Sequence, residues 1–168
     1  MLCVIARIDP DSRERLSALR RSAAGSGAGE LYGHVTLATY LGNEEDRFVA
    51  SCRELISGCA AFSVRYGRIK LLPATSILVA ALEKEGALLA LHGRIAERWS
   101  GSLDEWTGED LWLPHTTLLY DPVGDLAAAA AALAKAFVPF TARVERIEFS
   151  RVEETGYTIV GSVELPEA

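Results

Sequence analysis

Apolar and polar positions along the chain follow two different periods, and the changes between them predict its elements. Short apolar runs rich in β-branched residues predict strands at residues 2–8, 33–40, 62–72, 76–82, 112–120, 139–150 and 156–165. Helical spacing or helix-forming composition predicts helices at residues 10–22, 44–57, 83–99 and 125–137. The chain is therefore expected to mix strands and helices along its whole length.

Two helix starts are marked by residues that can accept hydrogen bonds from first-turn amides. Asp9 precedes Pro10, and Pro is favoured at the first helical position, so we expect Asp9 to cap the first helix. Asn43 precedes the acidic run 44–46, which suits the positive end of a helix dipole. We therefore expect Asn43 to cap the second helix.

A four-residue pattern occurs twice and contains two of the three histidines. His34-Val35-Thr36-Leu37 and His115-Thr116-Thr117-Leu118 each follow a turn-prone residue and open a predicted strand. In a strand, side chains i and i+2 emerge on the same face, so each tetrad places an imidazole beside a hydroxyl. A given histidine acquires both partners by chance only about once in 200 cases. The duplication therefore indicates a functional pair.

The residue types in these tetrads suit phosphate chemistry. An imidazole can take or give a proton near neutral pH, and a neighbouring hydroxyl can hold a phosphoryl oxygen. We expect His34, His115, Thr36 and Thr117 to be the catalytic residues, with one histidine as general base and the other as general acid. His92 lacks a threonine two positions on and lies on the apolar stripe of a predicted helix, so we interpret it as structural.

The tetrad strand recurs once in each half of the chain and is followed by a helix each time. This recurrence predicts an α+β fold with two pseudo-symmetric lobes of antiparallel sheet, helices on their outer faces and a central cleft. A chain of 168 residues with 49% hydrophobic residues can bury such a core. We expect residues 1–168 to form a single bilobal domain.

The paired tetrads resemble the H-x-T-x signatures of the 2H phosphoesterase superfamily, which includes the 2′-5′ RNA ligase-like proteins. Leu41-Gly42 after the first tetrad and Pro114 before the second also fit that family. The resemblance implies a 2′,3′-cyclic phosphate or a 2′-5′ linkage as the scissile group, and it implies His115 as base and His34 as acid during hydrolysis. Tyr120 stands where many ligase-like relatives carry an arginine.

Charge and composition limit the partners. A net charge of −6 argues against binding of long duplex nucleic acid, which is held mainly by Lys and Arg, but it allows a nucleotide or an RNA end. Tyr40, Trp112 and Tyr120 flank the tetrads and are candidates for stacking on a base, with core packing as the alternative. The N-terminal residues do not resemble a signal peptide and no stretch has the roughly 20 apolar residues of a membrane span, so we expect a cytoplasmic protein. We also expect a monomer.

Several alternatives remain open from the sequence. The same groove could bind a nucleotide or RNA end without turnover, or it could ligate 2′-5′ linkages in the reverse direction. A zinc-binding regulator is a third possibility, but H-E-x-x-H and paired cysteines are missing, so we expect no metal or other cofactor. Cys3, Cys52 and Cys59 are expected to be free thiols. The Gly- and Ser-rich residues 22–29 are either a connector or a lid over the site.

Overall fold

The computed structural model describes residues 1–24, 33–120, 126–153 and 156–167. Its strands are β1 (Leu2–Ile8), β2 (His34–Tyr40), β3 (Phe62–Leu71), β4 (Ile77–Leu82), β5 (His115–Tyr120), β6 (Phe140–Glu153) and β7 (Gly156–Glu164). Its helices are α1 (Pro10–Ala24), α2 (Glu45–Ile56), α3 (Gly86–Trp99) and α4 (Leu126–Ala136), with a short 3-10 helix η1 (Glu105–Thr107). This content confirms the mixed α+β class predicted from the sequence.

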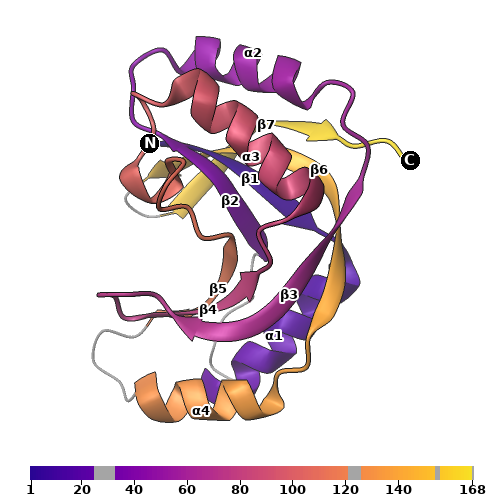
Figure 1. Cartoon of the computed structure of the whole chain (residues 1–168), viewed down its shortest axis with the longest axis vertical. Helices are drawn as coiled ribbons and strands as arrows, with labels where there is room; N and C mark the ends of the chain where they lie inside the picture. Colours follow the sequence, from indigo (N-terminus) through magenta and orange to yellow (C-terminus); the bar gives the residue numbers. More distant parts are fainter. Residues whose placement is uncertain (25–32, 121–125, 154–155, 168) are drawn as a thin grey trace.

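All seven strands belong to one antiparallel sheet in which the long strand β6 is shared by two halves. The order is β2-β1-β6-β3-β4-β5, and β7 also pairs with β6. One edge of β6 pairs with β1, while the other edge pairs first with β3 and then with β7. Each half of the sheet therefore has four strands including β6, and the sheet curves strongly between them (Figure 1).

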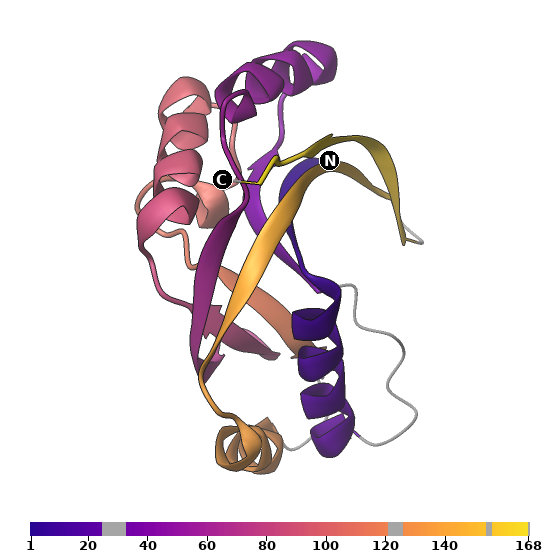
Figure 2. The same cartoon turned by 90° about the vertical axis from the view of Figure 1, so that its right-hand side faces the viewer.

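The four helices lie in two pairs, one at each end of the curved sheet. Helices α2 and α3 pack together beside the β1–β2 half, and α1 and α4 pack together beside β3 and β5 (Figures 1 and 2). The buried faces of α2 and α3 include Phe48, Cys52, Ile56, Leu88, Leu91 and Ile95. Within the described residues, no helix has the length and apolar character needed to cross a membrane.

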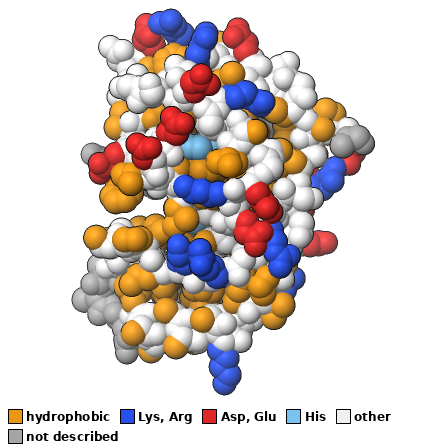
Figure 3. Space-filling model, viewed as in Figure 1, with side chains coloured by type: hydrophobic (Ala, Val, Ile, Leu, Met, Phe, Trp, Pro, Cys, Tyr) orange, Lys and Arg blue, Asp and Glu red, His pale blue; other side chains and the backbone are white. Residues whose placement is uncertain are grey.

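Charges of both signs are distributed over the surface. Lys and Arg side chains lie among Asp and Glu side chains on the face shown in Figure 3. Within the described part of the chain, ion pairs include Arg65 with Glu83 at 3.2 Å and Arg151 with Glu45 at 2.6 Å. This face presents a mixed field rather than a basic one, in keeping with the negative net charge.

The predicted cap of α2 was wrong by one residue. Glu44 rather than Asn43 is the N-cap, and no side chain caps the helix from that position. Instead, the Glu44 amide donates a hydrogen bond to the Tyr40 hydroxyl at 3.0 Å. A Cβ atom at Gly42 would lie only 2.3 Å from this hydroxyl, so the close approach requires glycine.

Helix α3 begins at Gly86, three residues later than predicted. The Glu83 amide donates to the Arg65 carbonyl at 3.0 Å, which extends the pairing of β4 with β3 past the end of the strand. The chain must leave the sheet before it can turn, and Gly86 has a φ of +58° at that point. A tertiary contact therefore overrides the local helical tendency of residues 83–85.

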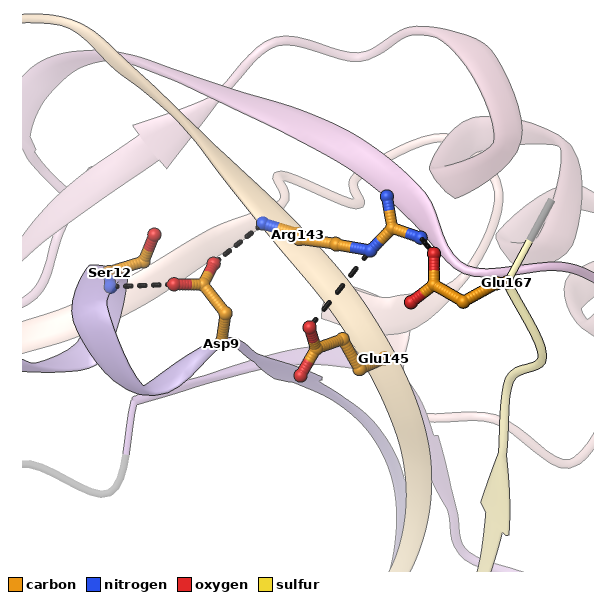
Figure 4. A network of polar contacts seen from close by, with 5 residues as sticks. All are labelled: Asp9, Ser12, Arg143, Glu145 and Glu167. Carbon is orange, nitrogen blue, oxygen red and sulfur yellow. Dashed lines mark hydrogen bonds and ion pairs between the residues drawn. The ribbon is translucent and has the colours of Figure 1, made fainter.

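Asp9 joins the start of α1 to β6, as Figure 4 shows. One carboxylate oxygen accepts from the Ser12 amide at 2.8 Å, which confirms the predicted cap, and the other accepts from the Arg143 amide at 2.7 Å. The Arg143 side chain also pairs with Glu167 and lies 4.0 Å from Glu145. Burial alone would raise the pKa of Asp9, but the backbone hydrogen bonds outweigh it, and the net pKa is lowered.

We predict that Asp9→Ala lowers the free energy of unfolding at pH 7 by about 1–2 kcal/mol, because two amides lose their acceptor. The exposed neighbour Asp11→Ala serves as the control and should cost only a few tenths of a kcal/mol. A lowered folded pKa means that the Asp9 contribution is present above its ordinary pKa of 3.8 and is lost as the pH falls below it. Urea denaturation at several pH values measures both effects, and equal losses in the two variants would contradict the assignment.

Candidate functional site

The two tetrads begin at opposite ends of the sheet order and are nevertheless in direct contact. His34 begins β2, which pairs only with β1, and His115 begins β5, which pairs only with β4 among the described strands. The Thr116 hydroxyl donates a hydrogen bond of 2.9 Å to the His34 carbonyl. Curvature of the sheet thus brings the first residue of one tetrad against the second residue of the other.

The Thr116 hydroxyl also forms a hydrogen bond with the Tyr66 hydroxyl. The two hydroxyl oxygens are 2.6 Å apart, and Tyr66 is completely buried. Because the single Thr116 proton goes to the His34 carbonyl, Tyr66 must donate to Thr116. Burial raises the pKa of Tyr66, so its hydroxyl keeps its proton for this bond. A chain of two hydrogen bonds therefore links β3, β5 and β2.

Two further side chains hold the outer edge of β2. The Trp112 indole donates to the Thr36 carbonyl at 2.9 Å, and Nδ1 of His92 donates to the Leu37 carbonyl at 2.9 Å. The two rings stack with their centroids 3.7 Å apart. His92 is buried and burial lowers its pKa. This confirms the structural interpretation of His92.

The alternation of burial along both tetrads follows the predicted pattern. Val35, Leu37, Thr116 and Leu118 are buried, whereas the first and third positions of each tetrad are more open. His34, Thr36 and His115 are half-buried, and Thr117 is exposed. Each imidazole therefore shares a face with the hydroxyl two residues later.

The His115 ring is fixed in one tautomer. Its Nδ1 lies 2.7 Å from the Leu113 carbonyl, which can only accept, so Nδ1 carries a proton and Nε2 is the remaining basic nitrogen. Burial lowers the pKa of His115, although the bond to Leu113 acts in the opposite direction. The free imidazole is therefore neutral at pH 7, with its basic nitrogen defined.

The surroundings of His34 favour its neutral form more strongly than those of His115 favour a neutral His115. Burial is the largest cause of the low pKa of His34, which falls to about 4. The charge of Arg7 lowers this pKa further, as does His115 whenever it is protonated, and Glu148 raises it. Arg7 is the register partner of His34 on β1. Gly33 leads into this position with a φ of +63°, which favours glycine. A charge on either imidazole would therefore disfavour a charge on the other.

Of the three aromatic residues expected to contact a substrate, two are buried and one is exposed. Tyr40 is 3% exposed and stacks on Phe48, and Trp112 is 1% exposed against His92. This corrects the expectation for Tyr40 and Trp112, because neither ring has a face open to a ligand. Tyr120 is 65% exposed at the end of β5 and stays a candidate.

Metal-ligating residues do not gather in the described part of the chain. No group of three or more His, Cys, Asp or Glu side chains is placed there to hold an ion. Cys3, Cys52 and Cys59 are all free thiols. The possible lid at residues 22–29 falls largely outside the described residues.

A family comparison agrees with this geometry. The model of the 2′-5′ RNA ligase superfamily matches residues 8–156, which includes both tetrads. The chain belongs to the 2′-5′ RNA ligase superfamily. This confirms the resemblance to 2H phosphoesterases drawn from the tetrads. No curated protein matches the sequence significantly.

Solved structures share the superfamily fold at low sequence identity. TT0787 of Thermus thermophilus aligns with a TM-score of 0.66 and 16% identity, covering 99% of this chain and 98% of that one. Escherichia coli LigT complexed with 3′-AMP aligns with a TM-score of 0.62 and 17% identity, covering 98% and 96%. LigT complexed with NADP+ gives 0.63 and 18%, covering 99% and 97%. These likenesses show the fold alone.

We predict that Thr116→Val and Thr117→Val differ sharply in stability although the residues are adjacent. Thr116→Val removes the donor to His34 and the acceptor for Tyr66, both in a buried setting, and should lower the free energy of unfolding by about 1–3 kcal/mol. Thr117 is exposed, so Thr117→Val should change it by less than about 0.5 kcal/mol. Thermal and urea denaturation compare the pair, and similar stabilities would show that the Thr116 bonds do not hold the two strands together.

Proposed function

We propose that the protein is a metal-independent phosphoesterase that uses the two tetrads as one catalytic site. The observation that carries this proposal is the hydrogen bond from Thr116 to the His34 carbonyl, which joins the two histidine-bearing strands. Simple binding of a phosphate would not require two imidazoles with basic nitrogens in one site. Superfamily membership supports an enzyme in general, and the residue chemistry supports this reaction type.

In the proposed reaction one histidine activates water and the other protonates the departing oxygen. The P–O bond to the leaving group breaks as the bond from the attacking oxygen forms; the base takes a proton from the attacking water, and the acid gives one to the leaving oxygen. Thr36 and Thr117 would donate hydrogen bonds to the non-bridging phosphoryl oxygens, where negative charge accumulates. The resemblance assigns His115 as base and His34 as acid, and the reverse direction would exchange these roles.

Binding of the substrate would set the protonation states. Both histidines have lowered pKa values in the free protein, so neither is charged at pH 7. The negative charge of a bound phosphodiester favours the imidazolium form of a nearby histidine. An anionic substrate can therefore generate the acid that its own cleavage requires, while the second imidazole stays neutral as base.

A nucleotide or RNA end is the proposed substrate, with a 2′,3′-cyclic phosphate or a 2′-5′ linkage as the scissile group. LigT has been crystallised with 3′-AMP, NADP+ and ATP, which supports nucleotide binding by this fold. The net charge of −6 favours a small ligand over a long nucleic acid. Ligation in the 2′-5′ direction would use the same groups. We also propose that the protein is cytoplasmic and monomeric.

We predict that His34→Ala and His115→Ala each lower kcat by about 10²–10⁴-fold, the usual cost of losing a general acid or base. Thr36→Ala and Thr117→Ala should each raise the barrier by about 1.5–3 kcal/mol, as expected for a lost hydrogen bond to a charged group. The double histidine variant should be scarcely slower than either single variant, because the pair acts as a unit. Turnover of 2′,3′-cyclic nucleotides, cyclic-ended RNA and 2′-5′-linked oligonucleotides is the assay.

The third histidine provides the control for these variants. His92→Gln keeps a donor for the Leu37 carbonyl and should retain turnover near that of the wild-type protein. The assay is run with a chelator throughout, and full activity is expected. Loss of activity in the chelator with recovery on adding zinc or magnesium would overturn the metal-independent mechanism, and loss in His92→Gln with the fold intact would overturn the assignment of the tetrads.

We also predict an acidic pH profile. Both histidines have pKa values below the ordinary 6.5, so the protonated acid in the free enzyme is lost as the pH rises through a value below 6.5. The value of kcat/KM should therefore decline above a midpoint under pH 6.5, whereas kcat should decline at higher pH because the bound anion raises the pKa of the acid. Initial-rate measurements from acidic to mildly alkaline pH test this, and a kcat/KM that keeps rising through neutral pH would contradict it.

A further inference from the structure

Tyr66 lies in the core, outside both tetrads, yet its hydroxyl reaches the link between them. Its side chain is fully buried, and within the described residues its hydroxyl has a single hydrogen-bond partner, Thr116, at 2.6 Å. Thr116 in turn donates to the His34 carbonyl at 2.9 Å. The peptide group of His34 is therefore two hydrogen bonds away from a buried phenol on another strand.

The Tyr66 side chain has to cross a whole strand to make this bond. In the sheet order, β4 lies between β3, which carries Tyr66, and β5, which carries Thr116. Two inter-strand spacings amount to roughly 10 Å in a flat sheet, which few side chains can help to span. The residue of β4 in register with Thr116 is Ala80, which is small and fully buried. A long side chain with a polar end thus occurs together with a small residue in the strand that it crosses.

The ring and the hydroxyl of Tyr66 have separate contacts. The ring stacks on Phe140 with the centroids 4.9 Å apart, and a phenylalanine ring could pack in the same way. The hydroxyl adds only the bond to Thr116, and burying a hydroxyl costs free energy unless such a bond is made. Core packing therefore accounts for the ring, whereas the hydroxyl serves the contact between β5 and β2.

This contact acts on the backbone of a proposed catalytic residue. Strand β2 pairs with β1 along one edge, and Thr116 donates to His34 from the other. Without the Tyr66 hydroxyl, the Thr116 hydroxyl is freer to rotate away from the carbonyl, because a hydroxyl takes the direction that its partners set. The His34 imidazole would then lose part of its alignment with His115, and small displacements of a reacting group lower turnover steeply.

We propose that Tyr66 is a positioning residue for His34 and acts through Thr116. It does not touch the substrate; its hydroxyl directs the Thr116 proton to the His34 carbonyl and so holds the first tetrad against the second. The inference rests on the proposed function, because it assigns the effect to the alignment of the two histidines. A buried residue of β3 thereby controls turnover and leaves substrate binding unchanged.

The test removes one oxygen atom from the core. Tyr66→Phe should lower kcat about 10-fold while KM changes less than about 2-fold, because the groups that would bind phosphate are kept. Tyr40→Phe is the matched control, since Tyr40 is also buried and its hydroxyl also has one described bond, from the Glu44 amide at 3.0 Å. Both variants lose a buried hydrogen bond and should be destabilised in urea, but Tyr40→Phe should keep the wild-type kcat.

A double-mutant cycle identifies the route of the effect. If Tyr66 acts through Thr116, Tyr66→Phe should lower kcat in the wild-type protein and in Thr116→Ser, which keeps the hydroxyl, but should have no further effect in Thr116→Val. A further loss of about 10-fold in Thr116→Val would show that the effect takes another route. A kcat of Tyr66→Phe equal to that of Tyr40→Phe would show that the hydroxyl is merely structural. Either result overturns the proposal.

NMR titration of the histidines gives a second measure of alignment that needs no turnover. Burial is the largest cause of the low pKa of His34, and Tyr66→Phe keeps the groups whose charges act on it, Arg7, His115 and Glu148. A loosened His34 is less buried, so its titration midpoint should rise from about 4 toward the ordinary 6.5 in this variant.

The same titration separates this proposal from the proposed function. Tyr40→Phe should leave the His34 midpoint at the wild-type value. If the wild-type protein cleaves none of the substrates, the proposed function fails, and the titration decides the positioning role: a raised midpoint in Tyr66→Phe alone supports it, and a midpoint equal to that of the wild-type protein overturns it.

Discussion

The hydrogen bonds of the Thr116 hydroxyl are the constraint on which the arrangement of the site depends. Strands β2 and β5 lie at opposite ends of the sheet order and share no backbone ladder among the described residues. The two strands are joined instead by a side chain: the Thr116 hydroxyl of β5 donates to the His34 carbonyl of β2, which links the tetrads directly. The tetrads are consequently not equivalent. The second position of one is Val35, which packs in the core, and the second position of the other is the polar link, Thr116.

The outer edge of β2 shows how a strand can end a sheet without exposing its backbone. Thr116, Trp112 and His92 each give one proton to a carbonyl of this edge, and the Thr107 hydroxyl accepts from the Thr39 amide at 2.9 Å. Core side chains are normally apolar. Polar ones are needed here because a buried carbonyl without a hydrogen-bond donor costs free energy. These polar residues form hydrogen bonds with the peptide groups at the edge of β2 and fix the backbone that carries the proposed acid–base and phosphate-binding groups. The same hydrogen bonds therefore stabilise the fold and position these groups.

Most of the fold was predictable because its signals are local. Strand β1 matched its predicted bounds, α1 began at Pro10 after the Asp9 cap, and the alternation in both tetrads gave the correct faces. The errors have tertiary causes: α2 begins one residue later than expected, where the Glu44 amide donates to the Tyr40 hydroxyl, and core contacts bury Tyr40 and Trp112.

The electrostatics of the site suit the single phosphate that we propose as its ligand. Two neutral imidazoles and two hydroxyls can receive an anion without the standing positive charge that would attract long nucleic acids. Arg7 adds a cation beside His34, but Glu148 on β6 opposes its effect on that histidine. In the proposed reaction, the charge of the bound phosphate would therefore help to create the acid.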